Sequence, residues 1–226
     1  MSRLLEGEGA ADTNVTSYYV IVKHETPPRA GRPRDLSKDE ATLVATRRLL
    51  SEVGYQQTTV AAIARMAGVN TPAIYRRWPT REALIEEAVH GTGGHPLPDE
   101  SGDLRTDLAT WVRIFLIRAA RPAARAGVPG LLADSQTQEA RQRLLAIGAP
   151  VRKAFQELLD GAVARGEIAA GVNAMFLFDL LSGTTTMRGL TRGVEDEEDF
   201  VDALAGSLYV LAAHATEASD VTAVNR

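Results

Sequence analysis

The sequence predicts an all-α protein. From residue 36 onward, apolar residues recur every three to four positions, and Thr and Gly residues stand where helices would start and end. No alternating strand pattern and no βαβ rhythm follows these helices, so helix packed upon helix must form the core. A chain of 226 residues has room for a small module joined to a larger one.

We expect three regions along the chain. Residues 1–34 form a flexible extension that ends in a basic arm, residues 35–90 form a small helical module, and residues 91–226 form a larger helical domain. The glycine- and proline-rich sequence GTGGHPLP at 91–98 predicts the loop between the last two regions.

The extension carries little helical signal. Val15–Lys23 has the composition of a strand, and three interpretations stay open for it: disorder, a stray edge strand, or a start site placed too far upstream. The sequence GRPR at 31–34 cannot be helical through its proline, so Arg32 and Arg34 should lie on an extended arm.

Four short helices are expected in the small module, because capping residues recur ahead of apolar stripes. The expected N-caps are Ser37, Thr59, Thr71 and Thr80. The first three helices are expected to end at Gly54, Gly68 and Trp78. The middle two helices have the spacing of a helix-turn-helix. Counted from Val60 as position one, small Ala64 is fifth where helices cross, Gly68 is ninth in the turn, and Ile74 is fifteenth in the core.

The larger domain also reads as helices. They are expected at 101–120, at 123–135 with a break near Gly127–Gly130, at 138–165 with a kink or division at Pro150, and at 174–191 and 196–216. The last two are apolar on nearly every face, so every face must be covered. A second copy's pair would complete a four-helix bundle, and a buried hairpin in a monomer is the alternative.

Charge is divided unequally along the chain. Residues 31–81 hold nine Lys or Arg and four Asp or Glu, a net charge of +5, whereas the whole chain carries −4. A basic module on an acidic body indicates a polyanionic partner for the module, and chance clustering of arginines is the alternative.

The stretch VGYQQTTVAAIARMAGVNTPAIYRRWPTREALI closely resembles the DNA-binding domain of the TetR family of bacterial regulators. The features that carry the resemblance are a glycine followed by an aromatic residue, a Thr-capped helix with Ile-Ala, the turn Ala-Gly-Val, and Ile-Tyr followed by two polar residues and an aromatic residue. The dense part of the match covers residues 37–90, about a quarter of the chain. An extended GRPR-like arm is also common in that family.

The resemblance implies that the third helix enters the major groove of DNA with its N-terminus first. Toward the base edges it places four residues: Thr71, Pro72, Ala73 and Arg76. Arg76 is the specificity candidate, because a guanidinium can bond two acceptors of guanine, and Ala73 could contact a thymine methyl group. The resemblance implies phosphate contacts for Tyr75 and Arg77, while a structural Tyr75 and a merely solvated arginine pair remain alternatives.

Further DNA contacts are expected around this helix. Thr59 and Arg81 stand at helix N-termini, where backbone N–H groups suit a phosphate. Arg32 and Arg34 could enter the neighbouring minor groove or belong to a tail that makes no contact. Trp78 is expected in the core, between the third and fourth helices.

In the TetR family the C-terminal domain binds a small molecule and forms the dimer. The residues that would line a pocket here are Trp111, Phe115, Arg118, Phe155, Phe178 and Ser182. Aromatic residues on amphipathic helices also serve as ordinary core, so that interpretation stays open. A buried Arg118 would need an anionic partner, either a ligand carboxylate or an internal Asp.

Enzymes, metal sites and membrane proteins are disfavoured. Cysteine is absent, the four histidines have no metal-ligand spacing, and no long apolar segment occurs. The acidic run EDEED at 195–199 opens a helix, where acids complement the helix dipole. We expect no metal and no cofactor.

The sequence therefore predicts a cytoplasmic, nucleoid-associated, homodimeric repressor that binds a palindromic DNA operator and is released by a small-molecule effector. The alternatives are an activator or architectural DNA-binding protein without a ligand, and an all-α ligand-sequestering protein.

Overall fold

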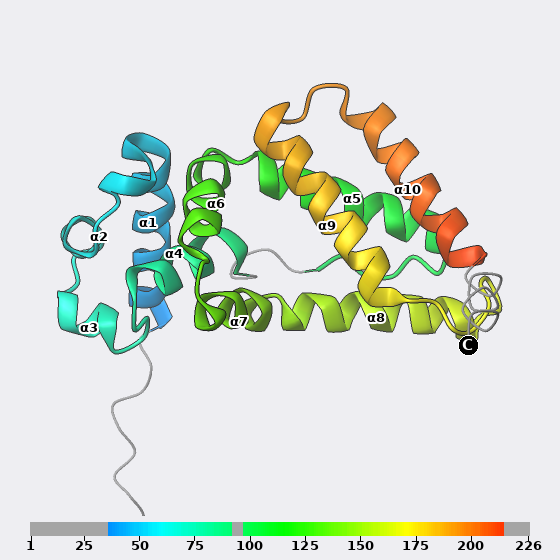
Figure 1. The fold of residues 1–226 in the computed structure, drawn as a ribbon, viewed down its shortest axis with the longest axis horizontal. Coiled ribbons are helices and arrows are strands. Elements are labelled where there is room, and N and C mark those ends of the chain that lie inside the picture. The colour runs from blue at the N-terminus through cyan, green and yellow to red at the C-terminus, as the bar shows by residue number, and fades with distance from the viewer. Residues whose placement is uncertain (1–35, 92–96, 215–226) are drawn as a thin grey trace, which may run out of the picture. The chain divides into compact units, whose positions relative to one another are not determined.

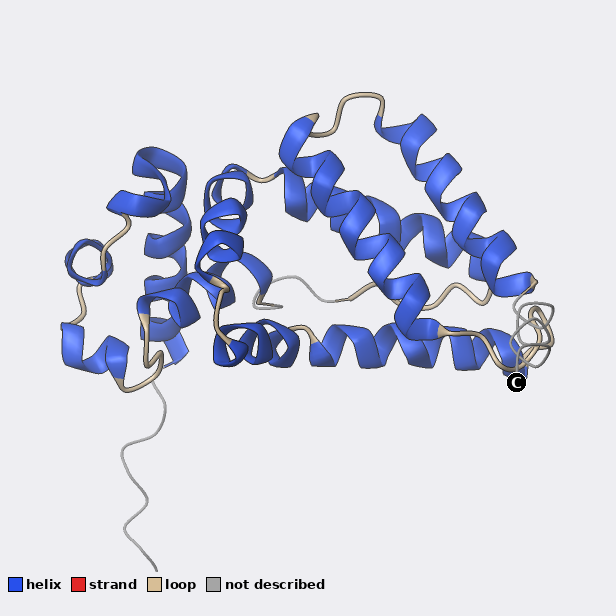
Figure 2. Ribbon diagram, viewed as in Figure 1, coloured by secondary structure: helices blue, strands red, loops and turns tan. Residues whose placement is uncertain are grey.

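A computed structural model describes residues 36–91 and 97–214 of the chain. Arg32 and Arg34, and with them the expected flexible arm, lie outside the described residues. Within the described ranges, every regular element is a helix (Figures 1 and 2). The helices are α1 (Leu36–Gln57), α2 (Val60–Ala67), α3 (Thr71–Tyr75), α4 (Arg81–His90), α5 (Leu104–Ala120), α6 (Pro122–Asp134), α7 (Gln138–Ile147), α8 (Ala149–Ala164), α9 (Ala174–Thr191) and α10 (Glu197–Ala213).

The first four helices pack around one apolar core. Ile63, Ile74 and Leu84 are fully buried there, and Trp78 packs beside them, as expected for core residues. Helix α1 is kinked at Gly54, where the backbone has a φ of 80°. It includes Leu36, so Ser37 lies in the first turn of the helix and is not the residue that precedes it.

Helix α6 joins this module to the rest of the chain. It packs on α1 and α4 (Figure 1), and a small core forms from Leu50, Tyr55, Ile85, Ala123 and Leu131. The predicted break in this helix is wrong, because α6 continues without interruption through Pro129. The glycines that suggested the break serve instead as sites of close approach: Gly127 to Val89 of α4 and Leu50 of α1, and Gly130 to Tyr55 of α1.

The larger core lies among α5, α8, α9 and α10. Helix α5 contacts both α9 and α10, and Phe155, Leu181 and Leu208 are fully buried in this cluster. The expected division of the long segment at Pro150 is confirmed, because α7 ends at Ile147 and α8 begins at Ala149. Among the described residues, no helix is both long and apolar enough to cross a membrane.

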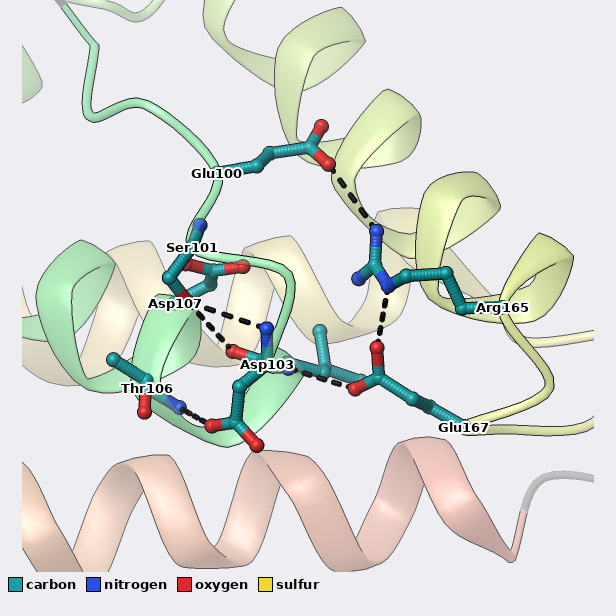
Figure 3. Close-up of polar contacts among 8 residues, drawn as sticks. Glu100, Ser101, Asp103, Thr106, Asp107, Arg165 and Glu167 are labelled. Atoms are coloured by element: carbon teal, nitrogen blue, oxygen red, sulfur yellow. Dashed lines mark hydrogen bonds and ion pairs between the residues drawn. The ribbon is translucent and has the colours of Figure 1, made fainter.

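Polar contacts fix the start of α5 against the turn after α8 (Figure 3). A carboxylate oxygen of Glu167 accepts the backbone N–H of Leu104 at 2.8 Å. Arg165 bridges Glu167, at 2.5 Å, and Glu100, at 3.5 Å. Asp103 caps the same helix through its side chain. Glu167 thus satisfies a backbone donor that no intrahelical carbonyl could reach.

Candidate nucleic-acid interface

The turn between α2 and α3 follows from its sequence. Gly68 ends α2 in the left-handed conformation, with a φ of 66°, and its N–H donates to the carbonyl of Ala64. No atom lies within 4 Å of the position that a Cβ would take, so the positive φ is what favours glycine there. The hydroxyl of Thr59 caps α2 by accepting the N–H of Ala62 at 3.2 Å, as expected.

Helix α3 begins one residue earlier than the sequence suggested. Asn70 is the N-cap, and its Oδ1 accepts the N–H of Ala73 at 2.8 Å. Thr71 is therefore the first helical residue and Pro72 the second. The expectation that Thr71 caps this helix is wrong. Both arrangements suit a proline, because the first-turn N–H groups have no intrahelical acceptor in either case.

The surface of α3 separates into a buried side and an open side. Ile74 is buried, whereas 48% of Tyr75 is exposed and Arg76 is exposed beside it. Pro72 is exposed and Ala73 is half-buried at the start of the helix. This open side is a short cationic and aromatic surface, the composition that phosphate and base-edge recognition require.

Arg77 is less exposed than Arg76. Its guanidinium forms an ion pair with Asp39 in the first turn of α1, and both side chains are about four-fifths buried, with exposures of 23% and 20%. The next residue, Trp78, donates its indole N–H to a carboxylate oxygen of Glu87 at 2.6 Å. The adjacent arginines thus occupy different environments.

The Arg81 side chain points into the protein. Its Nε donates to the carbonyl of Thr58 at 2.8 Å, a second nitrogen donates to the carbonyl of Tyr55, and the guanidinium lies 4.3 Å from the Tyr55 ring centre. The expected phosphate site at the start of α4 therefore rests on backbone N–H groups. One of these, on Ala83, is already donated to the Thr80 hydroxyl.

Two polar contacts connect the small module to α6 and α7. The Tyr55 hydroxyl donates to Asp134 at 2.5 Å, across 79 residues of sequence. Glu86 on α4 is 2% exposed, and Arg143 of α7 reaches both of its carboxylate oxygens at 3.4 Å. Neither acid was singled out from the sequence, because their partners become visible only once the helices are packed.

The expected pocket residues contact one another. Trp111 lies 5.9 Å from the ring of Phe115 and 5.2 Å from that of Phe155. Phe178 makes edge-on contacts with Phe115 at 5.7 Å and with Phe155 at 5.6 Å. The structure brings all four rings together, as a packed aromatic cluster.

The two polar residues expected beside these rings lie on α5 and α9. Arg118 is half-buried, and burial together with the positive charge of Arg121 lowers the pKa of its guanidinium. Ser182 is half-buried on α9, and its hydroxyl donates to the carbonyl of Asp179 at 3.5 Å.

An open groove of about 530 Å³ lies elsewhere, along α9. None of the six expected pocket residues lines it. The groove is lined by Asp179, Leu180, Gly183, Thr184, Met187, Arg188, Thr191, Arg192 and Phe200. No local sequence pattern indicates this groove, because it depends on the placement of Phe200 of α10 beside α9.

Two family profiles match the chain. One, described as bacterial regulatory proteins of the tetR family, matches residues 43–88, and the other, described as a tetracyclin repressor-like C-terminal domain, matches residues 97–208. Both fall within the ranges that carry the helix-turn-helix and the helical body.

Known proteins resemble the chain over most of its length. The HTH-type transcriptional regulator Mb1581 of Mycobacterium bovis is 30% identical over 200 residues, which cover 80% of this chain and 92% of that protein. The DNA-binding transcriptional repressor TetR of Mycobacteroides abscessus is 27% identical over 184 residues, which cover 79% of this chain and 95% of that protein. The crystal structure of the TetR family transcription regulator SCO0332 superposes with a TM-score of 0.63 at 27% identity, over 76% of this chain and 97% of that one. The chain belongs to the TetR family of bacterial transcriptional regulators.

Proposed function

We propose that the protein is a homodimeric repressor that reads a palindromic operator through α3 and releases it when a small molecule binds the helical body. The observation that carries the proposal is the open side of α3, where Tyr75 and Arg76 are exposed while Ile74 and Trp78 anchor the helix in the core. The similarity of the chain to a protein named as a transcriptional repressor supports repression over activation.

DNA contacts are assigned by where each side chain lies. Arg76 is proposed to read a guanine, Thr71, Pro72 and Ala73 to face neighbouring base edges, and Tyr75 to contact a phosphate. The N-termini of α2, at Thr59, and of α4, at Arg81, would add contacts from backbone N–H groups to phosphates. Arg32 and Arg34 stay candidates for the minor groove. Arg77 could bind a phosphate only by sharing or leaving its ion pair with Asp39.

The proposed dimer forms through α9 and α10. Large apolar side chains remain exposed on both helices: Met175, Phe176, Met187, Val210 and Leu211. The groove along α9 lies on the same exposed surface and includes Gly183, where a partner helix could approach closely. Burying these side chains against a second copy would stabilise the dimer by roughly 25 cal/mol for each Å² of apolar area removed from water.

The dimer can be tested directly. Met187→Glu and Val210→Glu each place a charge in the proposed interface, and sedimentation velocity should then show monomers. Leu145→Glu is the matched control, because Leu145 is 60% exposed on α7 and lies outside this surface. A variant pair that stays dimeric would show that α9 and α10 do not form the interface.

The proposed effector would enter between the four aromatic rings, with Arg118 and Ser182 as the polar groups beside it. Since the chain holds two tryptophans, Trp78→Phe leaves Trp111 as a single fluorescent reporter of this cluster. Titration of this variant with a metabolite library should shift Trp111 emission, and the same compounds should weaken DNA binding by the wild type, which keeps Trp78. The close ring contacts favour an alternative function, that of a DNA-binding protein without a ligand. Under that alternative, no compound would change both Trp111 emission and DNA binding.

Selection of bound sequences from random duplex DNA tests the whole proposal. A palindromic consensus with half-sites about one helical turn apart is expected. Recovery of no sequence preference from a folded dimer would contradict it.

A further inference from the structure

The recognition helix α3 is held from its C-terminal end. It has five residues, too few to fix its own orientation through intrahelical bonds. Two residues just beyond its end connect it to different helices: Arg77 to Asp39 of α1, and Trp78 to Glu87 of α4. The backbone N–H groups of both residues also return to the carbonyl of Ile74, each at 2.9 Å.

We propose that Asp39 is a positioning residue for DNA recognition, which acts by holding Arg77 so that Tyr75 and Arg76 face the DNA. The inference rests on the DNA-binding assignment and deepens it by giving the paired arginines different functions. In this proposal Arg76 contacts the base edges, and Arg77 holds the end of α3 against α1. This differs from the phosphate contact that the family resemblance implies for Arg77.

The surroundings of the ion pair support a positioning function. Both side chains are largely buried, so solvent screens the pair less than it screens an exposed one. By contrast, the adjacent acid Glu40 is half-exposed and pairs with Arg47 within α1. Asp39 is therefore the acid in this turn that connects α1 to the end of the recognition helix.

Electrostatics and positioning predict opposite results when Asp39 loses its charge. Removing an acid from a DNA-binding surface should strengthen binding to every duplex, because phosphate repulsion falls. Releasing the end of α3 should instead weaken binding to the operator, because base contacts require a fixed helix, while binding to other sequences keeps its phosphate contacts. The ratio of the two affinities separates these effects.

The experiment uses the full-length protein and two duplexes, one selected from random DNA by the wild type and one scrambled version of it. Asp39→Asn keeps the shape and removes the charge, and Glu40→Gln is the control at the adjacent position. We expect Asp39→Asn to lower the operator-to-scrambled affinity ratio by about tenfold or more, on the scale of losing one or more base contacts, with an unchanged salt slope. Glu40→Gln should change the ratio less than about twofold, as expected for an exposed pair.

Two further variants keep the test decisive if Asp39→Asn folds poorly. Arg77→Lys retains the positive charge but loses the planar fork, and it should lower the ratio in the same way. The exchanged pair Asp39→Arg with Arg77→Asp should recover part of the ratio. If Arg77 bound a phosphate, the same exchange would place an acid against the DNA and abolish binding.

Tighter binding of Asp39→Asn to both duplexes, with a salt slope steeper by about 0.9, would overturn the proposal and identify Arg77 as a phosphate ligand that Asp39 restrains. An unchanged ratio would also overturn it. Failure of the DNA-binding function itself is distinguishable, because the wild type would then select no sequence in the first place.

Discussion

The hydroxyl of Tyr55, just beyond the kink of α1, donates a 2.5 Å hydrogen bond to the carboxylate of Asp134 at the end of α6. Arg81 of α4 lies over the same ring, and the Tyr55 ring packs on Gly130, where an added Cβ would come within 2.3 Å of it. Three helices therefore meet at one tyrosine. Tyr55 therefore links α6 to the DNA-binding module by direct contacts.

Replacing Tyr55 by Phe should reveal this bond through the pH dependence of stability. Burial, and then the hydrogen bond to Asp134, raise the pKa of the Tyr55 hydroxyl, so the native state keeps a proton that the unfolded chain loses above about pH 10. The stability that Tyr55 contributes is complete below that pH and is lost as the pH rises above it.

Urea unfolding at neutral pH should show Tyr55→Phe to be less stable by about 1.5–3 kcal/mol, the range for a hydrogen bond to a charged group. The difference from the wild type should shrink between about pH 10 and 11. A constant difference over that range would show that the hydroxyl is not held in its protonated form.

Removal of Arg143 should destabilise the protein more than removal of an exposed cation. Arg143→Ala leaves the buried Glu86 carboxylate without this partner, and we expect a loss of roughly 1–3 kcal/mol. Lys153→Ala is the control, since Lys153 is 77% exposed and pairs with Glu157 one turn away. It should change the unfolding free energy by less than about 0.5 kcal/mol. Equal effects in chemical denaturation would contradict a structural function for the Glu86 pair.

Two glycines of α9 should respond oppositely to alanine. A Cβ on Gly189 would lie 2.6 Å from the Cβ of Ala119 and 2.8 Å from the backbone of α5, so the two helices must separate. We expect Gly189→Ala to destabilise by about 1–3 kcal/mol. Gly183→Ala meets no atom of its own chain within 4 Å, so in the background of the interface variant Met187→Glu it should gain up to about 1 kcal/mol of helix propensity. Thermal unfolding at one fixed protein concentration compares them, and a stable Gly189→Ala would show that α5 and α9 can separate easily.

Arg76→Ala should relax sequence preference. Loss of a bidentate guanine contact lowers operator affinity by about 1–3 kcal/mol while binding to a scrambled duplex changes little. Arg48→Ala removes the same charge from the exposed side of α1, where Arg48 pairs with Glu52 at 2.7 Å, and should leave the preference intact. Repeating the selection from random DNA with each variant checks this, and an unchanged consensus for Arg76→Ala would exclude a base-reading function.

Features that depend on neighbouring residues were predictable from the sequence. The cap at Thr59, the turn at Gly68 and the division at Pro150 follow from propensities that act within one turn of helix. The N-cap of α3 lies one residue before the predicted Thr71, because Asn70 and Thr71 can both cap and sequence alone does not rank them.

Contacts between helices were not predictable in the same way. Asp39 of α1 meets Arg77 just after α3, and Tyr55 of α1 meets Asp134 of α6, only in the packed fold. A single sequence shows that these residues are polar but not which surface each one faces. The arginine pair shows the limit well, because of two identical neighbours after α3 one is exposed and the other is held in an ion pair with Asp39.

The start of α3 has few free donors. Pro72 has no N–H, and Asn70 already accepts the N–H of Ala73. A phosphate would therefore find little to bind at this helix terminus, and in the proposed complex with DNA the contacts of α3 would come from its side chains. Substitutions at Thr71, Ala73 and Arg76 could then change the preferred sequence without altering how the module is built, so regulators with new operators can arise from this framework through a few surface mutations.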